Sequence, residues 1–219
     1  MKKNLLTVLT IMICFIALAQ ESNGNNKKSF LSLQLGASIP LGDFSNTNFS
    51  NEEAGFSLTG ISLDMNYLYH FTENVGLAAT GFYNMNGLDI SKLREETGIR
   101  SLKMDHWQFI GLAAGPAFSF EMSPKVIGDI RIMGGLATAN SPDITTNGSS
   151  LIPEDWGTTG LFQAGVGCRV KIGPNSYFSG GVDYRYLKPT FKVTVGNETI
   201  SAEQNISVLN ISVGIGFKF

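Results

Sequence analysis

The end of the chain, residues 209–219, alternates without a break between large apolar side chains and small or polar ones. The apolar face consists of Leu209, Ile211, Val213, Ile215, Phe217 and Phe219. The opposite face consists of Asn210, Ser212, Gly214, Gly216 and Lys218. A period of two is that of a β-strand, and two faces this different indicate a strand between an apolar and a more polar environment. The sequence therefore predicts a C-terminal amphipathic strand.

The same alternation recurs seven times earlier in the chain. The predicted strands cover about 31–39, 61–70, 75–85, 106–120, 126–137, 162–172 and 178–186. The strand at 106–120 is the least clear, because both of its faces are apolar. Together with the last strand this makes eight, a number typical of an all-β barrel or sandwich.

The connections between these strands alternate in length. The links at 72–74, 121–125 and 173–176 are short turns. The others are loops of roughly a dozen residues or more, at 43–54, 87–104, 140–158 and 188–204. Short turns on one side and long loops on the other are typical of outer-membrane barrels, in which the turns are periplasmic. The prediction is an all-β, eight-stranded antiparallel up-and-down transmembrane β-barrel over residues 29–219, with both termini periplasmic.

A soluble barrel or sandwich would also alternate, so the content of the two faces decides between the classes. The polar faces here are mostly Gly, Ser and Asn with few charges, which suits the narrow interior of an eight-stranded barrel better than a solvated exterior. Aromatic residues also gather near predicted strand ends, like the girdles of membrane barrels, at Tyr67, Tyr69, Phe71, Tyr184 and Tyr186. No apolar run beyond residue 19 approaches 18 residues, which argues against a helical membrane protein.

The first residues are those of a secretory signal peptide. Lys2 and Lys3 precede an apolar stretch at 5–19, and small residues stand at positions 17 and 19. We expect cleavage after Ala19, which leaves a periplasmic tail at 20–28 before the barrel. A lipoprotein signal is disfavoured because Ile13 precedes Cys14 within a continuing apolar run.

Cleavage would take the net charge from −2 to −4, since two lysines leave with the signal. No large basic patch remains for nucleic acid. Cys168 becomes the lone cysteine, so neither a disulfide nor a metal site is expected. The glycine pairs 165/167 and 214/216 lack the context of a phosphate-binding loop, and no cofactor is expected.

The chain resembles the small outer-membrane β-barrel proteins described as porin-family, PorT-like or outer membrane protein A-like. The resemblance spans 29–219 and rests on the signal peptide, the segments 36–44 (GASIPLGDF) and 132–136 (IMGGL), Pro142 and the terminal Phe219. It implies a place in the bacterial outer membrane, with lipid around the barrel. It also implies that the barrel-assembly machinery recognises the alternating 209–219 strand during insertion. No peptidoglycan-binding domain is expected after the last strand.

Six ionisable residues fall on the predicted inner faces: Asp64, Asp129, Arg131, Arg169, Asp183 and Arg185. Lys171 and Lys218 lie on the same faces nearer the periplasmic rim. Three acids and three arginines balance, and buried charges need partners, so a salt-bridged interior network is expected. A narrow or gated polar path is the alternative.

Catalysis in such barrels needs a base, usually histidine, with a nucleophile or carboxylate within reach. Only His70 and His106 are present, and neither has a serine two residues away on its strand. We therefore expect no enzyme. The leading hypothesis is a structural role in the envelope or a surface interaction through the four long loops, which carry a net charge of −5. A small pore or conduit for small or hydrophobic molecules is the alternative, and a lipid-modifying enzyme comes third.

Overall fold

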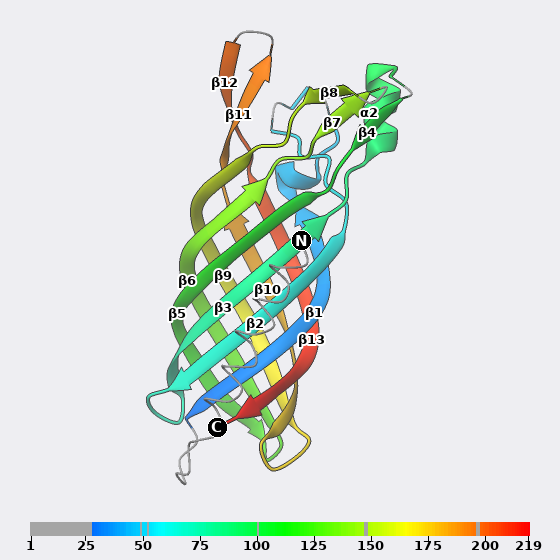
Figure 1. The fold of residues 1–219 in the computed structure, drawn as a ribbon. Helices are drawn as coiled ribbons and strands as arrows, with labels where there is room; N and C mark the ends of the chain where they lie inside the picture. The colour runs from blue at the N-terminus through cyan, green and yellow to red at the C-terminus, as the bar shows by residue number, and fades with distance from the viewer. Residues whose placement is uncertain (1–27, 49, 52, 100, 147–148, 196–197) are drawn as a thin grey trace.

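The structure, a computed structural model, describes residues 28–48, 50–51, 53–99, 101–146, 149–195 and 198–219. Its eight long strands form a closed antiparallel barrel (Figure 1). They are β1 (Ser29–Leu41), β2 (Gly60–His70), β3 (Val75–Asn86), β5 (Trp107–Ser123), β6 (Val126–Asn140), β9 (Trp156–Lys171), β10 (Ser176–Leu187) and β13 (Ile206–Lys218). The predicted eight-stranded barrel is confirmed. The predicted signal peptide at 1–19 lies outside the described residues, as does all of the 20–28 tail except Lys28.

The barrel closes where the first strand pairs with the last. The β1–β13 ladder runs from Phe30 opposite Lys218 to Leu41 opposite Ser207. A ladder this long leaves no free edge along the seam, as a barrel in lipid requires. The β5–β6 ladder is interrupted beside Pro116, a residue that has no N–H to donate.

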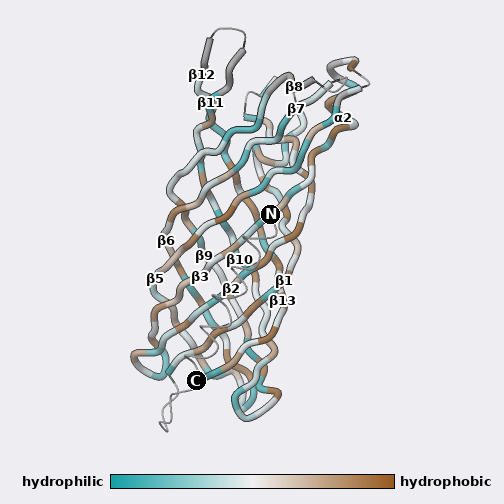
Figure 2. Tube along the Cα trace, in the orientation of Figure 1, coloured by the Kyte–Doolittle hydropathy of each residue, from teal (hydrophilic) through white to brown (hydrophobic). Residues whose placement is uncertain are grey.

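The two faces of the strands differ as the alternation predicted. Outward side chains are apolar and exposed, for example Leu112 at 70% and Leu136 at 65% exposure. Inward positions include many buried polar residues, and the alternation of hydropathy along each strand is visible in Figure 2. Both faces of the last strand lie as expected, with Phe217 exposed and Asn210 and Ser212 buried.

Several strands extend beyond their predicted limits at one end of the barrel. The strand expected at 162–172 begins at Trp156, and the one expected at 126–137 continues to Asn140. These extensions pair with each other, for instance Thr138 with Thr158. The sequence prediction missed them because Gly, Thr and Asn at these positions interrupt the apolar alternation.

The two ends of the barrel are built differently. At the terminus end, which holds Ser29 and Phe219, short turns join the strands (Figure 1). At the loop end the connections contain further structure: η1 (Gly42–Ser45), α2 (Ile90–Thr97), β4 (Leu102–Met104), β7 (Ile144–Thr146), β8 (Ser149–Ile152), β11 (Thr190–Val195) and β12 (Glu198–Glu203). Strands β4, β7 and β8 form one small sheet, and β11 and β12 form a hairpin. None of the described helices is long and apolar enough to cross a membrane.

The second long loop contains helix α2. Its sequence predicts a short helical turn at 91–96 with Asp89 or Ser91 as the cap. In the structure Asp89 is the cap, and its side chain accepts a hydrogen bond from the backbone N–H of Lys92 at 3.1 Å. Gly98 ends the helix in the left-handed conformation, with φ of 70°. The small sheet and the hairpin were not predicted.

Candidate functional site

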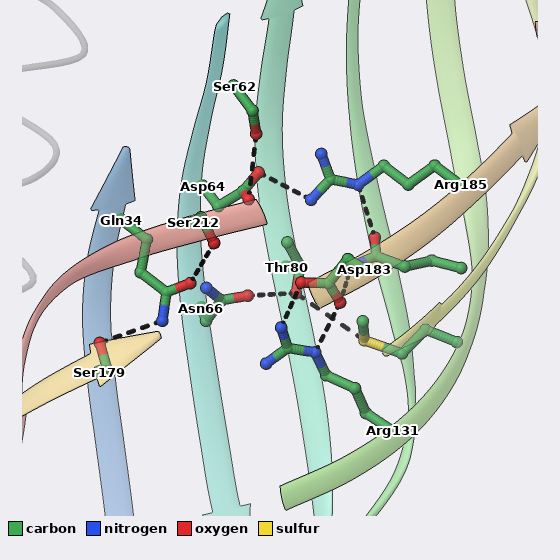
Figure 3. A network of polar contacts seen from close by, with 12 residues as sticks. Gln34, Ser62, Asp64, Asn66, Thr80, Arg131, Ser179, Asp183, Arg185 and Ser212 are labelled. Carbon is green, nitrogen blue, oxygen red and sulfur yellow. Dashed lines mark hydrogen bonds and ion pairs between the residues drawn. The ribbon is translucent and has the colours of Figure 1, made fainter. Parts of the chain in front are cut away.

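The barrel interior brings the six predicted ionisable residues together as three ion pairs. Arg131 contacts Asp183 at 2.5 Å, Arg169 contacts Asp129 at 2.6 Å, and Arg185 contacts Asp64 at 2.7 Å. In each pair the two residues come from different strands. Figure 3 shows the Arg131–Asp183 and Arg185–Asp64 pairs. The interior is therefore crossed by paired charges, as buried charges require.

Arg185, like its partner Asp64, has 0% exposure. Its Nη2 donates to Asp64, its Nη1 to the Asn84 Oδ1 at 2.9 Å, and its Nε to the Gln163 Oε1 at 3.2 Å. The guanidinium also lies 4.2 Å from the centroid of the Phe82 ring. Each of the three guanidinium nitrogens therefore donates to an oxygen of another side chain.

Arg131 and Asp183 form a two-pronged pair, in which Nε and Nη2 each donate to one carboxylate oxygen. Glycines make room for it. A Cβ on Gly165 would stand 2.0 Å from the Asp183 Oδ1, so a side chain there would displace the carboxylate. Gly165 on the inner face of β9 thus makes room for this ion pair, a role that composition alone did not reveal.

The third pair lies nearest the terminus end. Arg169 donates from Nε and Nη2 to both oxygens of Asp129 and also to the Ser119 Oγ. Its guanidinium carbon lies 4.7 Å from the centroid of the Phe30 ring. Of the two lysines expected on the inner face near this end, Lys171 is exposed and Lys218 faces the cavity described below.

Neutral polar side chains link the walls between the ion pairs. Gln34 bridges two strands by donating to Ser179 at 3.0 Å and accepting from Ser212 at 2.8 Å. Thr80 donates to the Asn66 Oδ1 at 2.7 Å (Figure 3). The sequence placed these residues on the inner faces but could not assign their partners.

At the loop end a cluster of apolar side chains lies inside the barrel. The apolar plug comprises Phe44, Trp107, Phe109, Leu187, Phe191, Ile206 and Val208, all 7% exposed or less. Segment η1 carries Phe44 into the barrel mouth, where its ring packs edge-on against Trp107 and Phe109. The Trp107 Nε1 donates to the Gly55 carbonyl at 2.9 Å and fixes the same loop. The plug explains why both faces of the 106–120 segment are apolar.

Two cavities lie next to the ion pairs, toward the terminus end of the barrel. The vestibule is an open cavity of about 820 Å³ at the terminus end, whose wall includes Lys28, His70, Glu73, Glu121, Arg169 and Lys218. The chamber is a small cavity of about 30 Å³ further inside, whose wall includes Ser32, Asn66, Asp129, Arg131, Gly167 and Arg169. Arg169 belongs to both walls, so the Arg169–Asp129 pair separates the chamber from the vestibule.

His70 has a serine in reach that the sequence could not show. Its Nε2 lies 3.1 Å from the Ser119 Oγ, on a strand that is not adjacent in sequence. That hydroxyl also donates to Asp129 at 2.6 Å and accepts from Arg169. The serine is thus part of the ion-pair network. His106 is exposed and lies 3.6 Å from Asp105. Within the described ranges, no group of three or more His, Cys, Asp or Glu residues could hold a metal ion.

The loop end carries the connections expected to meet an external partner. Loop 43–54 folds partly into the mouth through η1, while 87–104 holds α2 and β4, 140–158 holds β7 and β8, and 188–204 holds β11 and β12. An exposed pair, Lys188 with Glu203 at 2.6 Å, fastens the base of the hairpin. The hydrogen bond and the charge of Glu203 raise the pKa of the Lys188 amine.

The chain was compared with known protein families and with curated proteins. Residues 6–219 match the model of the outer membrane protein beta-barrel domain. None of the curated proteins matches the sequence.

Solved structures share the fold at low sequence identity. The attachment invasion locus protein Ail of Yersinia pestis has a TM-score of 0.50 and 15% identity, with 88% of this chain and 99% of Ail covered. Neisserial surface protein A has a TM-score of 0.51 and 15% identity over 87% of this chain and 97% of its own. A major outer membrane protein from Thermus thermophilus has a TM-score of 0.53 and 11% identity over 87% and 99%. At these identities the likeness concerns the fold alone.

Proposed function

The chain belongs to the outer membrane protein beta-barrel domain family, and from this we propose that it is a closed, non-enzymatic barrel that presents a binding surface at its loop end. Its place is the bacterial outer membrane. In this proposal the barrel anchors the protein in the outer membrane, and the structured loops bind a partner outside the cell.

The observation that carries the proposal is that the loop end holds regular secondary structure, while the ion pairs and the apolar plug fill the barrel interior. The β11–β12 hairpin projects beyond the barrel rim, and the β4–β7–β8 sheet with α2 stands beside it (Figure 1). Strands fixed by their own hydrogen bonds present side chains in constant positions, which lowers the entropy lost on binding. Function in rigid scaffolds is commonly carried by such loops.

We place the loop end outside the cell and the terminus end in the periplasm. The support is the contrast between short turns at the terminus end and long connections at the loop end, the arrangement that outer-membrane barrels share. A signal peptide cleaved after Ala19 would deliver the chain to the periplasm, where the barrel-assembly machinery would receive the 209–219 strand.

A small pore is the second candidate, favoured by the vestibule of about 820 Å³. Against it stand the three ion pairs and the apolar plug, in which Phe109 and Val208 are both 0% exposed. A lateral conduit for hydrophobic molecules would need a gap between strands, whereas β1 and β13 pair along twelve positions.

Two measurements on the purified and the displayed protein test the proposal. In planar lipid bilayers we expect no channel conductance from the wild-type barrel. On cells we expect replacement of 190–203 by an Asn-Gly turn to abolish binding to a panel of extracellular-matrix proteins and glycans. Replacement of the terminus-end turn 173–175 by a turn of equal length serves as the control and should leave binding intact.

The results separate the hypotheses. Steady conductance would favour the pore. If the hairpin variant binds as well as the wild type while loss of the whole protein sensitises cells to detergent, the barrel has a structural role in the envelope instead. Turnover of ester or amide lipid substrates by the purified protein would overturn the non-enzymatic part of the proposal.

A further inference from the structure

The chamber contains hydrogen-bonding groups that no side chain satisfies. Among the described residues, the Ser32 Oγ and the Asn66 Nδ2 are buried without a hydrogen-bond partner, and both residues line the chamber. The Asn66 amide is oriented by Thr80, which donates to its oxygen at 2.7 Å and so leaves the NH₂ group for the chamber. A buried donor without an acceptor destabilises the fold, so an occupant that accepts hydrogen bonds would relieve this penalty.

Arg131 adds a third donor to the same space. Its hydrogen bonds to Asp183 come from Nε and Nη2, which leaves Nη1 for the chamber. Gly167 leaves the region in front of Nη1 open, because a Cβ at this position would occupy that region in van der Waals contact, at 3.9 Å from the nitrogen. A guanidinium N–H, a carboxamide N–H and a hydroxyl therefore converge on one cavity.

The free hydrogen-bonding groups of the chamber wall favour an anion over a cation. Asp183 pairs with Arg131 and Asp129 pairs with Arg169, so the charges around the chamber balance. Arg169 donates to both oxygens of Asp129, and Ser119 donates to one of them, so this carboxylate is already occupied. The wall consequently offers mainly donors, the groups that coordinate an anion.

Size and access limit what the anion can be. A volume of about 30 Å³ holds one ion of about the size of one or two water molecules, and is too small for a phosphate ester. The Arg169 side chain stands between the chamber and the vestibule, whose wall adds Lys28 and Lys218 to two glutamates. The vestibule is therefore the side from which an ion in solution approaches the chamber.

From this geometry we propose that the chamber is a halide site, in which Ser32, Asn66 and Arg131 coordinate one chloride ion. The ion satisfies the two unpartnered donors and ties β1, β2 and β6 together inside the barrel. Water is the competing occupant, since it too can accept hydrogen bonds from these groups.

Bromide is the probe for the test, because it replaces chloride and is visible by anomalous scattering. Crystals of the refolded wild-type barrel grown in sodium bromide should show one anomalous peak in contact with the Arg131 Nη1 and the Asn66 Nδ2. Gly167→Ala should remove the peak by filling the chamber. Its new Cβ would meet only ordinary contacts of 3.5 Å and longer, so the barrel should still fold.

Ser32→Ala and Ser38→Ala form a matched pair, since both serines are buried on the inner face of β1 but only Ser32 lines the chamber. Sulfate stabilises folded proteins in general, so the change in melting temperature from sulfate to bromide at equal ionic strength is compared among the variants. Relative to Gly167→Ala, this change should be more stabilising in the wild type and in Ser38→Ala, and by a smaller margin in Ser32→Ala. Density in the chamber without anomalous signal, a peak that survives Gly167→Ala, or an equal halide effect in all four proteins would overturn the proposal.

Discussion

Changing Asp64 to Asn removes one charge from the barrel interior and keeps the shape of the side chain. In the wild type the Asp64 Oδ1 accepts from the Arg185 Nη2 at 2.7 Å, and both side chains are 1% exposed or less. The substitution leaves the Arg185 cation without a counter-ion where water cannot reach it. The Asp183 carboxylate does not replace it, because that group is already engaged by Arg131 and Gln163.

The expected loss in the free energy of unfolding is large. Removing one partner of a buried ion pair costs about 3–5 kcal/mol, because the remaining charge stays desolvated. Asn84 and Gln163 would still accept from Arg185, so we expect the lower part of that range. Replacing both partners, Asp64→Leu with Arg185→Met, removes the uncompensated charge and should restore stability to within about 2 kcal/mol of the wild type.

Equilibrium urea titration of the barrel in lipid vesicles measures these differences. Fluorescence of the two tryptophans, Trp107 and Trp156, reports on the plug and the outer surface. Glu95→Gln is the control, since its pair with Lys92 is exposed and lies within one helix, and it should change stability by less than about 0.5 kcal/mol. An Asp64→Asn barrel as stable as the wild type would refute the reasoning, as would a double variant weaker than either single one.

Two further substitutions and one deletion, each with a control variant, test other parts of the structure. Gly165→Ala should lower stability by about 1–3 kcal/mol in the same titration, because its Cβ would stand 2.0 Å from the Asp183 Oδ1, whereas Gly160→Ala, with nothing within 4 Å, should not. Leu112 is 70% exposed on the outer face and lies within the strand ladders, so we expect it nearer the bilayer midplane than Ile172 at the terminus end. Leu112→Arg should therefore cost about 2–4 kcal/mol and Ile172→Arg about 0–1 kcal/mol, and equal losses would contradict this placement. Deletion of Phe219 should reduce the folded, heat-modifiable protein in the outer membrane while Phe219→Tyr should not, and full assembly without Phe219 would count against its role as an assembly signal.

The sequence predicted the barrel well where the alternation is undisturbed. In β1, β2, β3, β10 and β13 most inward residues are small or polar and most outward ones apolar, so parity alone assigns the faces. The segment 106–120 was harder because Phe109 and Trp107 point inward into the plug, which makes the inner face apolar too. Where the interior changes from polar to apolar along the barrel, a period-two pattern loses its contrast.

The sequence could not predict which inward-facing side chains contact one another, and the reason is a different one. Parity identifies which charged residues face inward, but the partner of each depends on the stagger between strands. Arg131 and Asp183 are 52 residues apart and meet across β9. The Ser119–His70 contact likewise joins two strands that flank β3. Neither sequence distance nor hydropathy encodes these contacts, whereas the closed register of eight strands does.

The interior charges also help to specify that register. A strand shifted by one residue would turn its inner face toward lipid, because side chains alternate between the two faces. For β10 such a shift would expose Asp183 and Arg185 to the hydrocarbon, at about 2–4 kcal/mol for the arginine alone near the midplane. It would also bring Tyr184 and Val182 into an interior where Gly165 and Gly167 leave space fitted to the Arg131 pair. A network that contributes little net stability over an apolar core can therefore still separate the native register from its neighbours by several kcal/mol.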